Sequence, residues 1–209
     1  MDYTDVTTIA IGYSNRDDEE TADNIDNFLR VMEAKVNREL RIGKMSIRAD
    51  IDLDTPGVSQ KYFDTPSDFG GLRSINYVNG AASNPLDYLN PSQMTILENS
   101  GNNSGYTCPA YYTNIAQQIQ VYPAFDEGNL EIVYYQKVPP LTESEPNNWL
   151  SDGDPDCYIF GLLVEISSFA KDAEAALLWD GRFKEVLSSL VNEDAIDRWS
   201  GTPMRTRLG

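Results

Sequence analysis

Two runs of alternating aspartates have the clearest capacity for chemistry in this sequence. They are Asp50, Asp52 and Asp54, and Asp152, Asp154 and Asp156. Carboxylates at this spacing could ligate calcium, but an EF-hand loop also needs glycine at its sixth position and glutamate at its twelfth, and neither run supplies them. We interpret the first run as the solvent face of a strand and the second as a linker with a helix cap. Whether the first run binds a cation stays open.

General acid–base catalysis is the second chemistry that the carboxylates could support. Glu143, Glu145 and Asp152 are the best candidates, as in a carboxylate-dependent glycan hydrolase. They lie in a stretch without basic residues, 141–154, which is typical of a solvated linker. Close pairs also arise by chance among 33 acidic residues. We therefore expect no enzyme activity and keep the hydrolase as an alternative.

The composition excludes several classes of protein. The chain has 16 Lys and Arg against 33 Asp and Glu, a net charge of −17, so its surface repels a phosphate backbone. It has no histidine, which rules out the Ser-His-Asp triad. Cys108 and Cys157 are too few for a zinc-thiolate site, so we expect no metal and no cofactor. The longest apolar stretch, 157–164, is too short to span a bilayer, so no membrane anchor is expected.

Three segments have the pattern of helices. Apolar residues recur every three or four positions over 24–41, and the opposite face, which includes Glu33, is expected to be solvated. Asp154-Pro155 predicts the start of a second helix, apolar on most sides. A third helix begins near 173 and ends before Gly201, with an inner side made of Leu177, Phe183, Val186, Leu187, Leu190 and Ile196. A short helix is also expected over 5–13.

The chain between these helices has the pattern of strands. Strands are predicted over 45–54, 58–63, 72–78, 115–122 and 130–138, with a short helix over 91–98. Tyrosines are concentrated here, and a platform for single-stranded nucleic acid would combine them with basic side chains, but 74–136 has neither lysine nor arginine. The tyrosines are therefore expected in a core or a protein interface. A β-sandwich that binds a receptor or a carbohydrate is the alternative.

These elements predict an α+β fold, a helical bundle of one N-terminal and two C-terminal helices with an inserted antiparallel β domain. The expected divisions are an N-terminal helical part, 1–44; the β domain, 45–140; a linker with the C-terminal helices, 141–199; and a C-terminal docking tail, 200–209. The tail contains two arginines and no acidic residue, which locally reverses the charge of the chain.

Three blocks of the sequence resemble one protein family. They are SNRDD over 14–18 with EAKVNRELR over 33–41; LEIVYYQKVPPL over 130–141 with NNWL over 147–150, Pro155-Asp156 and Tyr158; and FAKD over 169–172 with Trp179 and Phe183. In this order they resemble the head-to-tail adaptor proteins of tailed phages, also called connector or head-completion proteins. Gly161 departs from the helix former that the family tends to have there, so a kink or a close helix contact is expected.

The resemblance implies a structural virion protein at the head–tail interface, assembled in the host cytoplasm. It implies a homo-oligomeric ring, a dodecamer, that docks on the phage portal protein and extends the DNA channel without binding DNA specifically. The next partner is a tail nozzle or another tail component. In the tail we expect Arg205 and Arg207 to pair with acids of the portal or of a neighbouring adaptor, and Met204 and Leu208 to fill shallow apolar pockets.

Overall fold

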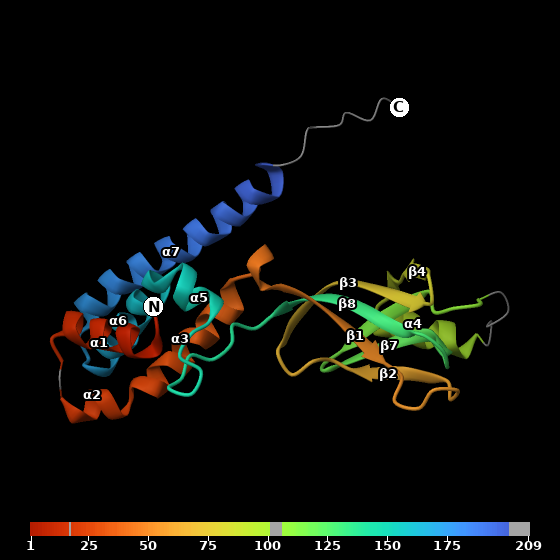
Figure 1. Cartoon of the computed structure of the whole chain (residues 1–209), viewed down its shortest axis with the longest axis horizontal. Helices are drawn as coiled ribbons and strands as arrows, with labels where there is room; N and C mark the ends of the chain where they lie inside the picture. The colour runs from red at the N-terminus through yellow and green to blue at the C-terminus, as the bar shows by residue number, and fades with distance from the viewer. Residues whose placement is uncertain (17, 101–105, 201–209) are drawn as a thin grey trace. The chain divides into compact units, whose positions relative to one another are not determined.

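The computed structural model describes residues 1–16, 18–100 and 106–200. The chain forms two compact units, a helical unit made of Met1–Met45 with the chain from Lys137 onward, and a sheet unit made of Ser46–Gln136. Helices from both ends of the chain build the first unit, and two sheets build the second (Figure 1). The predicted α+β fold, a helical bundle with an inserted β region, is confirmed.

The helical unit is arranged around one central helix. Its elements are α1 (Tyr3–Ser14), α2 (Glu19–Asp23), α3 (Ile25–Glu39), α5 (Trp149–Gly153), α6 (Pro155–Phe169) and α7 (Ala173–Ser200), with a 3-10 turn at Gly43–Met45. α6 contacts α1, α3, α5 and α7, which explains why its sequence is apolar on most sides. α3 has the single apolar stripe that its sequence predicts, with Phe28, Leu29, Met32 and Val36 buried.

Gly161 allows the close approach of α6 to its neighbours. A Cβ built on Gly161 would overlap Cγ of Met32 on α3 and would lie 3.1 Å from a ring carbon of Phe183 on α7. Both of these side chains are buried. The close helix contact expected at this position is therefore present, and it requires glycine because a side chain has no room.

The prediction for the inner side of α7 was wrong at two residues. Phe183, Leu187 and Leu190 are buried as predicted, but Leu177 is 74% exposed and Ile196 is 66% exposed. At 3.6 residues per turn these two lie about 120° and about 140° around the helix from Phe183. The inner side inferred from the sequence was therefore too wide.

The sheet unit contains two four-stranded sheets. The first has the order β1 (Ser46–Asp52), β8 (Asn129–Gln136), β3 (Phe69–Asn79), β4 (Ala82–Pro85), and the second has the order β2 (Gln60–Asp64), β7 (Gln118–Phe125), β6 (Tyr111–Ile115), β5 (Asp87–Tyr88). Neighbouring strands are antiparallel, apart from β5 and β6, which are parallel. The hydrophobic core of this unit contains Ile75, Leu130 and Ile132 from the first sheet and Phe63, Ile119 and Val121 from the second. α4 (Pro91–Asn99) contacts β6 and β7.

The single strand predicted over 115–122 was wrong, because this segment contains a hairpin. Ile115 at the end of β6 pairs with Gln118 at the start of β7, so Ala116 and Gln117 form a two-residue turn. Ala116 has φ 54°, a left-handed conformation that turns usually assign to glycine or asparagine. The turn therefore had no residue that marks it in the sequence.

Candidate interaction surfaces

A buried polar network in the helical unit holds the chain that follows β8 against α3 and α6. Oε1 of Glu33 accepts hydrogen bonds from the backbone N–H of Leu141 at 2.8 Å and from the Tyr158 hydroxyl at 3.0 Å. Asn148 donates through Nδ2 to the Tyr158 hydroxyl and to the Pro139 carbonyl, both at 2.7 Å. Glu33, Tyr158 and Asn148 are all buried. The two bonds to Glu33 join segments more than a hundred residues apart in sequence.

Asn148 also begins α5. Its Oδ1 accepts from the backbone N–H groups of Leu150 at 3.1 Å and Ser151 at 2.8 Å, and Ser151 Oγ accepts from the Asn148 N–H at 3.0 Å. This reciprocal arrangement is a capping box. Earlier in the same segment, the N–H of Val138 donates to Oδ1 of Asn37 at 2.8 Å. The chain from 138 to 151 is therefore fixed at both ends.

Burial in this network shifts the pKa values of its two ionisable side chains, Glu33 and Tyr158. Burial raises the pKa of the Glu33 carboxyl, and the hydrogen bonds from Leu141 and Tyr158 offset part of the rise. Burial, together with the charge of Glu33, raises the pKa of Tyr158 far above its ordinary range. A shifted carboxyl in a cleft is a candidate for acid–base chemistry, but Glu33 is only 6% exposed. The network therefore fits a structural role.

The first aspartate run lies on the solvent side of its strand. Asp50 and Asp52 are exposed on β1, and Asp54 follows the strand. Nη2 of Arg48 lies 2.6 Å from Glu131 Oε2, on the neighbouring strand, and 3.8 Å from Asp50 Oδ1. In residues 1–16, 18–100 and 106–200 no three acidic, cysteine or histidine side chains are grouped to hold a metal ion.

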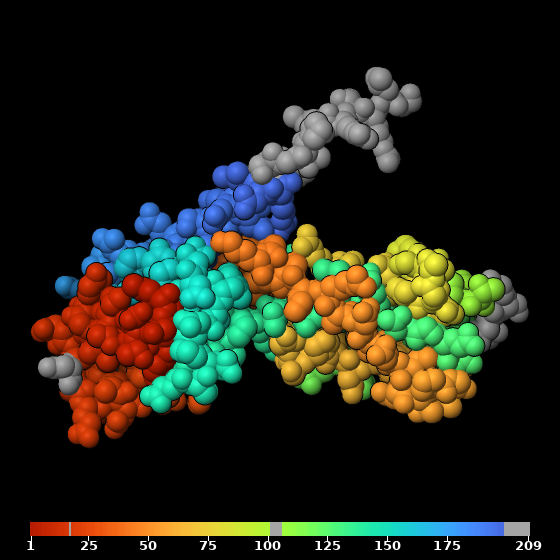
Figure 2. Space-filling view, viewed as in Figure 1, coloured from red at the N-terminus to blue at the C-terminus, as the bar shows by residue number. Residues whose placement is uncertain are grey.

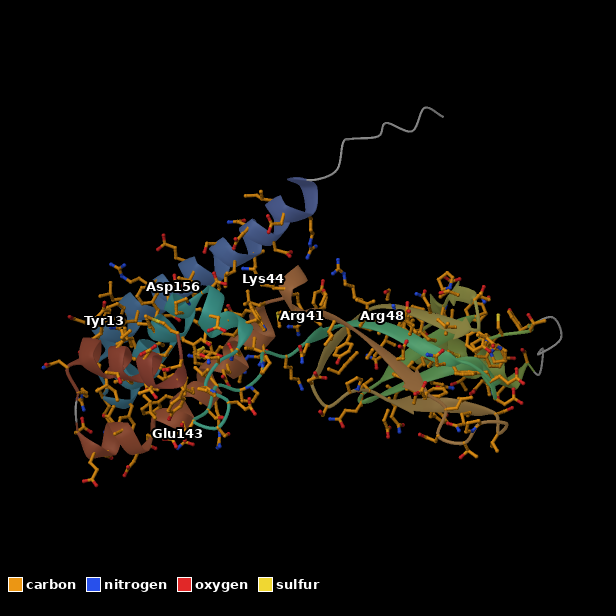
Figure 3. All side chains as sticks on the ribbon, viewed as in Figure 1. Tyr13, Arg41, Lys44, Arg48, Glu143 and Asp156 are labelled. Atoms are coloured by element: carbon orange, nitrogen blue, oxygen red, sulfur yellow. The ribbon has the colours of Figure 1, made fainter. Side chains whose placement is uncertain are left out.

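The remaining acidic candidates have separate surroundings. Glu143 and Glu145 are exposed in a turn closed by the hydrogen bond from Thr142 N–H to the Glu145 carbonyl at 3.1 Å. Oδ1 of Asp152, on α5, lies 3.5 Å from the N-terminal ammonium group. Glu143 and Asp156 lie on different sides of the helical unit (Figure 3). Glu143 and Asp156 therefore do not belong to one site.

Asp154 precedes α6, as predicted, but the expected side-chain cap is not formed. The residue also ends α5, with φ −135° and ψ 62° instead of the extended conformation typical of an N-cap. Its Oδ2 lies 3.4 Å from Nζ of Lys44. The carboxylate therefore pairs with a cation from the 3-10 turn that follows α3.

α7 exposes apolar side chains on its outer side. Leu177 and Leu178, adjacent near its start, are both exposed, and so are Val191 and Ile196 further along. Figure 2 shows α7 along an edge of the helical unit, with much of its length uncovered. Exposed leucines occur singly on most proteins, whereas adjacent ones beside a groove are typical of an interaction surface.

Two grooves lie along α7. The first, of about 540 Å³, lies between the end of α6 and the start of α7 and is lined by Val164, Ser168, Lys171, Asp172, Ala173, Ala176, Leu177 and Asp180. The second, of about 460 Å³, lies between the end of α3 and the middle of α7 and is lined by Glu39, Leu40, Lys184, Leu187, Ser188, Val191 and Asn192. Both leave space for side chains from a partner.

The tyrosines of the sheet unit divide between core and surface. Tyr77, Tyr122 and Tyr134 are buried, and Tyr62 and Tyr88 are exposed. The Tyr134 hydroxyl donates to Asp68 at 2.9 Å, and burial together with this bond raises the pKa of Tyr134 to about 12. The buried tyrosines have the predicted core role. The exposed ones remain available to a partner.

The four residues predicted as an interface, Met204, Arg205, Arg207 and Leu208, lie outside the described residues.

The sequence matches the family described as SU10 adaptor protein over residues 1–207. The chain belongs to the SU10 adaptor family. This is a family of phage head–tail adaptors, structural and non-enzymatic, so the resemblance seen in the sequence is confirmed. Membership implies a virion component with partners at the head–tail interface. No curated protein matches the chain, and no helix in its described part is long and apolar enough to cross a bilayer.

In this SU10 adaptor the first two of the three sequence blocks that resemble the family meet in the buried network. Glu33 and Asn37 come from the first block, Pro139 from the second, and Asn148 and Tyr158 from the segments that follow it. The sequence pattern did not indicate the network, because charge and periodicity place Glu33 on a solvated face. Its partners lie 108 and 125 positions away, beyond the range of any local pattern.

Proposed function

We propose that this SU10 adaptor forms a ring on the portal, extends the DNA channel and presents a new surface to the next tail component. The family match over residues 1–207 carries the proposal. It favours the adaptor over the glycan hydrolase and over the carbohydrate-binding β-sandwich, because those alternatives rest on acidic or tyrosine-rich composition alone.

The charge of the chain suits a conduit through which DNA passes without specific binding. Twelve copies at −17 each would carry about −200 formal charges, which repel phosphates at contact range and are screened beyond ~8 Å. In the sheet unit Arg48 pairs with Glu131 and Lys61 pairs with Glu98. These cations are therefore already neutralised.

Contact with the portal or with a neighbouring adaptor is assigned to the tail residues Met204, Arg205, Arg207 and Leu208. A segment with two arginines and no acid can form bidentate pairs with carboxylates of another subunit. The net charge of −17 opposes self-association, so the isolated protein stays monomeric and forms its ring on the portal. Light scattering without portal tests this point, because a stable ring at micromolar concentration would contradict it.

Co-sedimentation with the purified portal protein of the same phage tests the proposal. The full chain should sediment with the portal, whereas truncation after Trp199, or Arg205→Glu combined with Arg207→Glu, should weaken binding strongly. Neither change removes a buried residue of the described core, so circular dichroism should be unchanged. Full-strength binding of the truncated chain refutes the role of the tail. No binding by the full chain refutes the adaptor function, and glycan turnover that is lost in Glu143→Gln would favour the hydrolase.

A further inference from the structure

The corner between α6 and α7 holds a groove that the described residues leave open. Its apolar lining consists of Val164, Ala173, Ala176 and Leu177. Leu177 is the most exposed of the large apolar side chains in the described part of the chain. Removing such a side chain from water is favourable, so the binding of a partner's apolar groups in the groove is favourable as well. A volume of about 540 Å³ has room for a few side chains.

The C-terminal segment of the chain, 201–209, has chemistry that complements this groove. It offers the large apolar side chains Met204 and Leu208, and its only charged side chains are those of Arg205 and Arg207. The charged residues lining the groove are Lys171, Asp172 and Asp180, and Asp180 is paired with Lys184 at 2.7 Å. Over 1–45 and 137–200 the chain carries 23 acidic and 11 basic side chains, so two arginines meet opposite charge on this unit.

The segment is too short to fill the groove of its own chain. Along α7, Leu177 and Ser200 are separated by about 35 Å at 1.5 Å per residue. Eight residues separate Ser200 from Leu208, and a fully extended chain spans at most ~3.6 Å per residue, or about 29 Å. Met204 lies only four residues beyond Ser200 and reaches at most about 14 Å, so it cannot enter the groove of its own chain. An occupant that offers both Met204 and Leu208 therefore has to come from another copy.

We propose that Met204 and Leu208 of one copy bind in the α6–α7 groove of the next copy in the ring, with Arg205 and Arg207 paired to its carboxylates. This inference rests on the proposed function, because it requires the ring. The contact joins two different surfaces, the end of one chain and the start of α7 on the next. Repeated head-to-tail contacts of this kind generate closed rings when the rotation closes.

Cysteine cross-linking between two different single variants tests the contact. The background is Cys108→Ser, since Cys157 is buried and burial raises the pKa of its thiol to about 12, which leaves it unreactive. Chains with Leu177→Cys and chains with Leu208→Cys are mixed, assembled on the portal and oxidised. The matched control replaces Leu177→Cys by Leu178→Cys, an exposed neighbour that does not line the groove. We expect at least a tenfold excess of the two-chain product with Leu177→Cys over the control.

Three results would overturn the inference. Rings that form without the Leu177–Leu208 cross-link, or with equal yield at Leu178, overturn it while the adaptor function stands. A chain that carries both Val191→Cys and Leu208→Cys tests the second groove, which residues 201–209 can reach within their own chain. An intrachain cross-link in this variant would place Leu208 in that groove and overturn the inference. Absence of any assembly on the portal would overturn both the adaptor function and this contact.

Discussion

The Tyr158 hydroxyl donates a hydrogen bond to Oε1 of Glu33 at 3.0 Å, joining residues 125 positions apart. Because the backbone N–H of Leu141 donates to the same oxygen, one carboxylate connects α3, α6 and the segment that leads to α5. Loss of this buried acceptor would leave both donors without their hydrogen bond. The integrity of the helical unit therefore depends on Glu33.

Replacing Glu33 by alanine should destabilise the helical unit by about 3 kcal/mol, because two buried donors lose their acceptor. Glu33→Gln keeps an acceptor oxygen and removes the buried charge, so it should cost less than about 1 kcal/mol. Urea unfolding followed by tryptophan fluorescence measures the helical unit, since Trp149, Trp179 and Trp199 all belong to it. If both variants lose the same free energy of unfolding, the hydrogen bonds to Glu33 are not what stabilises the helical unit.

The stability of the wild-type chain should depend on pH through Glu33. Burial raises the pKa of Glu33 above its value in the unfolded chain, so between the two values the folded state binds a proton that the unfolded state does not. The contribution of Glu33 to the free energy of unfolding therefore falls as pH rises through this window. Relative to Glu33→Gln, the wild type should lose stability from the ordinary glutamate pKa upward. A constant difference between pH 4 and pH 8 would contradict this.

Gly161→Ala and Gly181→Ala should have opposite effects on stability. An added Cβ at Gly161 would collide with the buried Met32, so overpacking should outweigh the gain in helix propensity and cost about 1–2 kcal/mol. Nothing lies within 4 Å of a Cβ added at Gly181 on α7, so the same substitution should stabilise by about 0.5–1 kcal/mol. Denaturant midpoints at matched concentration compare the two, and a stabilising Gly161→Ala would refute the packing argument.

Local patterns identified α1, α3, α4, α6 and α7 and most of the strands, but not the short α2. In α3 the spacing of apolar residues in the sequence matches the spacing of the buried residues. Local patterns could not identify β6, whose turn to β7 uses Ala116 in a left-handed conformation. They also did not indicate α5, which lies inside the predicted linker and depends on the Asn148 capping box and on packing against α6. The buried state of Glu33 depends on contacts between distant segments. Family membership, by contrast, was visible in the order of short blocks.

Thr113→Val should stabilise the sheet unit by about 1 kcal/mol. Thr113 is fully buried on β6, and its Oγ1 is buried without a hydrogen-bond partner in the described part of the chain. Valine has nearly the same shape and removes the unsatisfied hydroxyl. Thr113→Ser is the matched control, because it keeps the hydroxyl, loses a methyl group and should destabilise by ~1 kcal/mol. Tyrosine near-UV circular dichroism follows this unit, and a destabilised Thr113→Val would mean that the hydroxyl is bonded.

Electron cryomicroscopy of the phage particle whose genome encodes this chain decides whether the protein is a head–tail adaptor. We expect a ring of copies between the portal and the next tail component, with density for both the helical unit and the sheet unit. Virions whose head–tail junction contains no copy of this chain would contradict the adaptor function.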